Sequence, residues 1–206
     1  MLFRLLLTDP ATFILIAFPL LYSLVLHEMG HAVAAAHFGD YTAKSYGRFS
    51  LNPLKHLDPV GTLMLLFLGF GWAKPVPVNY YYLRPQKTGI ICCALAGVTV
   101  NFLIAFLSLF MFKLSVLFFP VDKLQVALMV TAQINLLLAS FNLIPIPPLD
   151  GSRVLTVLSP PSWRNFLYNI ERYGMLIIIV LLYAGILNPI IDFIMNILLA
   201  IIGLIL

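Results

Sequence analysis

The sequence predicts an all-α protein that crosses a membrane several times, and three observations support this fold class. Hydrophobic residues make up 62% of the 206 positions, and charged residues make up only 10%, whereas a soluble domain averages about 25%. The mean hydropathy is +1.02. Several apolar runs reach the roughly 20 residues that a helix needs to cross a hydrocarbon core. We therefore expect about five to six transmembrane helices in a single domain, residues 1–206.

The first predicted span is the apolar run 11–38. A signal peptide is the alternative reading of an N-terminal run, but this one is too long, and we interpret it as a retained helix. Further helices are predicted at residues 88–119, 124–143, 152–158, 173–187 and 189–206. The last two are expected to form a C-terminal helical hairpin, about 173–206, behind a core of about 11–158.

The apolar run 60–72 differs from the others because it has only 13 residues and contains three glycines. It is too short for a span, and we expect a small re-entrant element resembling a β-hairpin. Non-helical backbone is tolerated at membrane depth where it is buried in protein or lines a cavity.

The distribution of basic residues along the chain supports a segment 60–72 that does not cross the membrane. In that layout one side of the membrane holds nine of the 12 Lys and Arg residues, namely Lys44, Arg48, Lys55, Lys74, Arg84, Lys87, Arg153, Arg164 and Arg172. The positive-inside rule makes this side cytoplasmic. The net charge of +4 therefore reflects orientation in a lipid bilayer, and we expect no nucleic-acid partner.

His27, Glu28 and His31 form an H-E-x-x-H motif inside the first predicted helix. Positions i and i+4 lie on one helical face, so both imidazoles can bind one metal ion while the glutamate acts as a general base. Zinc suits imidazole ligands, and we expect one Zn²⁺ per chain. A chance match is the alternative, but ionisable residues inside transmembrane helices are rare, costly and mostly functional.

A catalytic zinc site typically takes three protein ligands, and the chain offers eight acidic residues in total. Asp150 is the strongest candidate, because it follows an apolar span and a proline-rich stretch and precedes Gly151, which permits a sharp turn. Asp192 in the apolar tail is the plausible rival. From the residues alone, a role as the N-cap of the helix predicted at residues 152–158 explains Asp150 equally well. That role is compatible with zinc binding.

Three separated patches resemble the site-2 proteases, a family of intramembrane zinc metalloproteases. The first is the H-E-x-x-H motif. The second, residues 141–151, contains the family's Asn-x-x-Pro-x-x-x-x-Asp-Gly signature. The third, residues 96–101, is similar to an Ala-Gly-Pro-x-x-Asn element, with Val98 in place of proline. Residues 71–78 also resemble compact members of the family, which lack PDZ and CBS domains.

The resemblance implies that Asp150 is the third zinc ligand and that helices 11–38, 88–119 and 124–143 form a three-helix catalytic core. It implies a multi-pass protein of the cell membrane with its active site near the cytoplasmic side. The substrates would be transmembrane proteins, often regulators that the cut releases from the membrane. Zinc-activated water would attack the peptide bond, with Glu28 as the general base.

Asn101 and Asn142 are predicted to bind the substrate backbone or the developing oxyanion, because their amides lie on core helices. An interhelical hydrogen bond is the alternative for each. An edge within residues 60–78 is expected to hold an unwound substrate by strand addition. Two other functions stay open: a metal-binding transporter or sensor without proteolysis, and an inactive protease-like scaffold.

Overall fold

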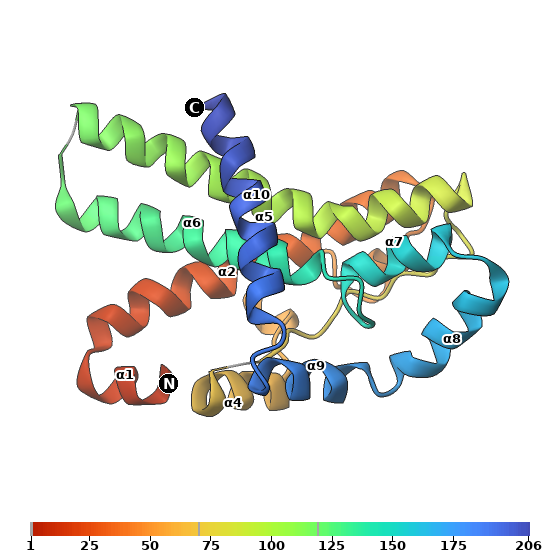
Figure 1. Ribbon diagram of the computed structural model, residues 1–206. Coiled ribbons are helices and arrows are strands. Elements are labelled where there is room, and N and C mark those ends of the chain that lie inside the picture. Colours follow the sequence, from red (N-terminus) through yellow and green to blue (C-terminus); the bar gives the residue numbers. More distant parts are fainter. Residues whose placement is uncertain (1, 70, 119) are drawn as a thin grey trace.

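The computed structural model describes residues 2–69, 71–118 and 120–206, and confirms an all-α chain (Figure 1). The four long helices are α2 (Pro10–His37), α5 (Gln86–Phe118), α6 (Asp122–Asn142) and α10 (Asn188–Ile205). The shorter ones are α1 (Leu2–Thr8), α3 (Thr42–Ser45), α4 (Pro59–Leu68), α7 (Asp150–Leu158), α8 (Pro161–Glu171) and α9 (Gly174–Tyr183), with a 3-10 turn at Pro53–Lys55.

Helices α2, α5, α6 and α10 are long and apolar enough to cross a membrane. A fifth span arises if α8 and α9, which meet at an angle of 76°, count as one. The predicted number of transmembrane spans, five to six, is therefore not confirmed. The segment predicted at 173–187 ends early, because Gly185 adopts a φ of 73° just beyond α9, a conformation that helices do not continue through. Phe119, the predicted end of the second span, lies outside the described residues.

Helix α2 carries both histidines of the H-E-x-x-H motif, and its ends follow from local chemistry. Asp9 caps its start by accepting a hydrogen bond of 3.1 Å from the Thr12 backbone N–H, and Pro10 suits the first helical position. At the other end Gly39 has a φ of 99°, which favours glycine and turns the chain out of the helix.

Helices α2, α5 and α6 pack together through small residues, and α10 packs on α6 (Figure 1). The buried small residues include Ala32, Ala35, Ala94, Ala105, Ala132 and Ala139. Such residues let membrane helices approach closely, which strengthens van der Waals packing where lipid removes any hydrophobic drive for association. At Gly30 the approach is so close that an added Cβ would lie 3.0 Å from Ala96 O.

The predicted β-hairpin-like element is not confirmed. Residues 59–68 form α4, which Asp58 caps through the Gly61 N–H at 2.8 Å. Gly69, with a φ of 78°, ends it. The only β-pairing among the described residues is a bridge between Leu57 and Ala73. Periodicity cannot separate a short apolar helix from a buried strand, and Phe70 lies outside the described residues.

The connector between α2 and α5 returns to the place where it leaves α2. The Arg84 N–H donates to Phe38 O at 2.8 Å, so the end of α2 and the start of α5 are neighbours and the two helices run in opposite directions. Helix α4 has ten residues and a length of about 15 Å, which is about half of a hydrocarbon core. It is too short to cross.

Candidate metal centre

His27, His31 and Asp150 meet inside the helix bundle. The two Nε2 atoms are 3.0 Å apart, and Asp150 Oδ2 lies 3.3 Å from each of them. The histidine side chains are only 7% and 11% exposed, and that of Asp150 is 17% exposed. This is the one group of metal-ligating side chains found in the described part of the chain.

Hydrogen bonds on the far side of each imidazole fix which nitrogen faces the cluster centre. His27 Nδ1 lies 2.7 Å from Asn101 Oδ1, and His31 Nδ1 lies 2.7 Å from the Cys93 carbonyl. Both oxygens are acceptors, so each Nδ1 donates its proton and each Nε2 is left with a bare lone pair. Outer partners of this kind are typical of metal-ligating histidines.

The donor set fits zinc. Two bare nitrogens and a carboxylate oxygen repel one another unless a cation lies between them. Asp150 Oδ2 is buried and accepts no hydrogen bond from any described residue. Tetrahedral ligands at about 2.0–2.1 Å from zinc lie about 3.3 Å from one another. Both separations of Asp150 Oδ2 agree with this value, and the two Nε2 atoms are slightly closer together.

The chain beyond α6 turns sharply to bring Asp150 back to α2. Gly151 makes this turn possible, because a Cβ at that position would lie 2.2 Å from Leu143 O. Ile144 and Leu149, at the two ends of the turn, are buried with Ile178 of α9 and Ile191 of α10. The C-terminal helices therefore hold the Asp150 turn in place, although the sequence patterns on them suggest no part in the site.

Gly97 of α5 lies against the rings of both histidines. A Cβ built there would lie 2.5 Å from His27 Cε1 and from His31 Nε2. Real atoms do not approach so closely, so any side chain at this position displaces both imidazoles. The Ala-Gly-x-x-x-Asn patch thus supplies a surface for the rings through Gly97 and a partner for His27 through Asn101.

Replacing Gly97 by alanine is expected to weaken zinc binding by about 10- to 100-fold, the range seen when supporting contacts around a metal are lost. Zinc competition against a chromophoric chelator measures this on the purified protein. Gly203→Ala on α10 is the matched control, because no atom of the described residues lies within 4 Å of a Cβ there. Equal zinc affinity in both variants would contradict the packing role of Gly97.

Asn101 is fully buried and engaged on both sides of its amide. Its Oδ1 contacts His27, and its Nδ2 donates to Asn135 Oδ1 at 3.1 Å. Asn135 of α6 in turn donates to Ser23 Oγ of α2 at 2.8 Å. This chain of hydrogen bonds joins the three core helices and orients the amide toward His27. Substrate binding by Asn101 stays a prediction.

Asn142 lies at the last residue of α6 and is half-buried. Its Nδ2 donates to Leu138 O in the same helix at 2.9 Å. Its predicted contact with substrate also stays a prediction.

Glu28 accepts a hydrogen bond from outside its own helix. Its Oε2 lies 2.7 Å from the backbone N of Val76, which belongs to a segment without helix or turn, residues 73–79, that we call the strap. Val76 is buried with Ala32 of α2 and Ala43. Further along, the Asn79 N–H donates to the buried Asp40 carboxylate at 2.7 Å. The strap is thus fastened beside the H-E-x-x-H motif at several points.

The other acidic residues lie elsewhere. Asp192, the rival third ligand, is exposed on α10, and Glu171 pairs with Arg153. Asp150 itself is the first residue of α7, whose N-cap is Leu149 with no side-chain cap. The N-cap alternative for Asp150 is therefore wrong.

Several contributors to the site give no clear signal in sequence. Asn135 lies in an ordinary apolar helix. The Cys93 carbonyl is a backbone group that any residue would supply, and the Val76 N–H is one that any residue except proline would supply. Gly97 belongs to a recognisable motif, but its contact with two imidazoles needs the packing of α2 on α5.

Comparison with known proteins agrees with this geometry. Residues 120–186 match Peptidase family M50. Bacillus subtilis YwhC, by its name a candidate zinc metalloprotease, is 39% identical over 168 residues, which cover 79% of this chain and 77% of YwhC. Rip2 of Mycobacterium tuberculosis, named in the same way, is 31% identical over 185 residues, 85% of this chain and 69% of Rip2. No solved structure matches.

The bundle and its buried donor set define a membrane zinc metalloprotease. The chain belongs to peptidase family M50, the site-2 proteases. It is an integral membrane protein and an enzyme of the metalloprotease class.

Proposed function

We propose that this protein is an intramembrane protease that hydrolyses peptide bonds within or near the transmembrane segments of other membrane proteins. The observation that carries the proposal is the position of the three convergent ligands. His31 and His27 precede the end of α2 at His37 by six and ten residues, which places them about 9 Å and 15 Å along the helix axis from that end. The site therefore lies inside the apolar bundle.

The chain's own residues account for the steps of hydrolysis. Zinc held by His27, His31 and Asp150 would supply a Lewis acid and would lower the pKa of a water molecule toward neutrality. Glu28 takes the proton of the attacking water and returns it to the leaving amine, so no covalent intermediate is needed. The Val76 N–H holds one carboxylate oxygen of Glu28 and fixes its direction. Asn101 holds His27 in the tautomer that presents Nε2.

A helical substrate hides its peptide bonds, so part of it must unwind, and its freed backbone groups need partners in lipid. The strap contains neither helix nor turn and lies beside Glu28. Pro75 and Pro77 lack an N–H, as is typical of edge strands. We propose that unwound substrate lies alongside the strap by strand addition. The connector between α2 and α5 carries basic residues. They favour a cytoplasmic position for the end of the bundle where α2 ends and α5 begins.

Co-expression with a panel of single-span membrane proteins tests the proposal. Wild type is expected to produce fragments whose ends, mapped by mass spectrometry, lie within or next to the apolar span. His27→Ala, which lacks one zinc ligand, is expected to produce none. Identical fragments from both proteins, or cuts confined to extramembrane segments, would rule out intramembrane proteolysis by this chain.

A further inference from the structure

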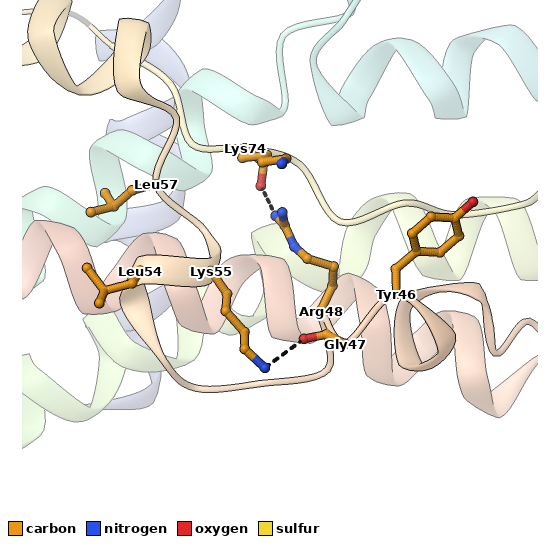
Figure 2. A pocket seen from close by; sticks show the side chains of 7 residues that line it. All are labelled: Tyr46, Gly47, Arg48, Leu54, Lys55, Leu57 and Lys74. Carbon is orange, nitrogen blue, oxygen red and sulfur yellow. Dashed lines mark hydrogen bonds between the residues drawn. The ribbon is translucent and has the colours of Figure 1, made fainter.

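A second site with its own chemistry lies in the connector between α2 and α5. It is a pocket of about 340 Å³, and Figure 2 shows three basic side chains around it, Arg48, Lys55 and Lys74. None of the described carboxylates lies within 4.0 Å of these cations, because the ion pairs found involve other residues. The three cations of the pocket therefore form no ion pair with any described residue.

Arg48 is the most constrained of the three cations. It is only 9% exposed. Its Nη2 donates to the carbonyl oxygens of Lys74, at 2.6 Å, and Pro75, at 3.4 Å. Its buried Nε has no hydrogen-bond partner among the described residues. A buried cation without an anionic partner is costly, and an anion in the pocket would reduce that cost.

Apolar side chains lie beside the charges. Leu54 and Tyr46 line the same pocket and are 77% and 73% exposed. Figure 2 shows Leu54 next to Lys55, and Tyr46 on the other side of Arg48. Tyrosine is enriched at membrane interfaces. Cations next to exposed apolar groups suit a ligand that has a charged head and an apolar body.

We propose that this pocket binds the phosphate group of an anionic membrane lipid, with Arg48, Lys55 and Lys74 around the phosphate and Leu54 and Tyr46 against the apolar part. Basic pockets at a membrane surface attract anionic headgroups in this way. Arg48 also holds the strap by its Lys74 and Pro75 carbonyls, so a bound lipid stabilises the connector. The site is separate from the metal centre and needs no proteolysis.

Native mass spectrometry of the full chain in neutral detergent tests the proposal with phosphatidylglycerol as the probe. Wild type is expected to retain one lipid per chain. Lys55→Gln/Lys74→Gln is expected to bind the lipid about 10- to 30-fold more weakly, since each lysine near an anionic lipid surface adds to the binding free energy. These two side chains are exposed, and neither substitution removes the Arg48 contacts with the strap.

Lys87→Gln/Lys123→Gln is the matched control, because it removes the same charge from two exposed lysines that do not line the pocket. It should bind like wild type. Displacement of bound phosphatidylglycerol by millimolar inorganic phosphate would support recognition of the lipid's phosphate group. Thermal stabilisation of wild type by inorganic phosphate, lost in the pocket variant, together with no retention of phosphatidylglycerol by wild type, would overturn the proposal, because the pocket would then take free phosphate and not a lipid. Equal lipid retention by all three proteins, or equal retention of phosphatidylcholine and phosphatidylglycerol by wild type, would overturn the proposal.

Discussion

Replacing Glu28 by glutamine is expected to lower the rate of substrate cleavage by about 10²- to 10⁴-fold, the usual contribution of general acid–base catalysis, while the protein keeps its zinc. Glutamine has the shape of glutamate, and its side-chain carbonyl can still accept the Val76 N–H that now binds Glu28 Oε2. The strap therefore stays in place, and only the ability to take a proton is lost. Cleavage of a membrane substrate in detergent, together with the zinc content per chain, measures both effects.

The same variant separates the protease from the transporter or sensor that the sequence alone left open. In a transporter Glu28 is dispensable as a base, so metal uptake into vesicles would survive Glu28→Gln. In a protease cleavage disappears and the metal stays. Cleavage at the wild-type rate by Glu28→Gln would refute the role of this residue as the base.

Asp150→Asn is expected to weaken zinc binding by at least about 100-fold, the upper end of the losses caused by disturbing supporting contacts, and to abolish cleavage with it. Asp150 Oδ2 lies 3.3 Å from both Nε2 atoms and accepts no hydrogen bond from any residue that the structure describes. An amide in its place carries no charge, and its NH₂ group can donate to an imidazole and occupy the space of the metal. Zinc content and chelator competition measure the loss.

Asp192→Asn is the control for this substitution, because it makes the same chemical change at the exposed acid of α10 that the sequence left as a rival ligand. It should keep zinc and activity. A second measurement guards against simple misfolding: a chelator should lower the melting temperature of wild type and of Asp192→Asn, because a ligand that binds only the folded state stabilises it. It should leave that of Asp150→Asn unchanged. Zinc loss in Asp192→Asn with zinc retained in Asp150→Asn would reverse the assignment.

The position of Asp150 shows why the third ligand could not be settled from the residues alone. The spacing of His27 and His31 needs only one turn of α2, which any helix provides. Asp150 is 119 residues beyond His31, and its approach depends on the Gly151 turn and on the packing of Ile144 and Leu149 against the C-terminal helices. Those contacts are long-range, and no local pattern encodes them.

The segment 60–72 and the asparagines illustrate the same limit at other places. The length of segment 60–72 indicated that it does not cross the membrane, but an apolar run of that length fits either a helix or a strand. In the structure, capping by Asp58 starts the helix α4. Asn101 stood out as polar on an apolar helix. Its partners, His27 and Asn135, follow from the order in which α2, α5 and α6 pack.

The sequence by itself determined the membrane class, the all-α architecture, the ends of the long helices to within a few residues, and the pair of imidazoles on one face of α2. These follow from hydrophobic content and from helical periodicity, which act over one or two turns. Only the tertiary structure decided the approach of Asp150, the tautomers of both histidines, the contact of Gly97 with their rings, and the strap beside Glu28. Each of these joins atoms from different helices, and only the packing of those helices brings them within contact distance.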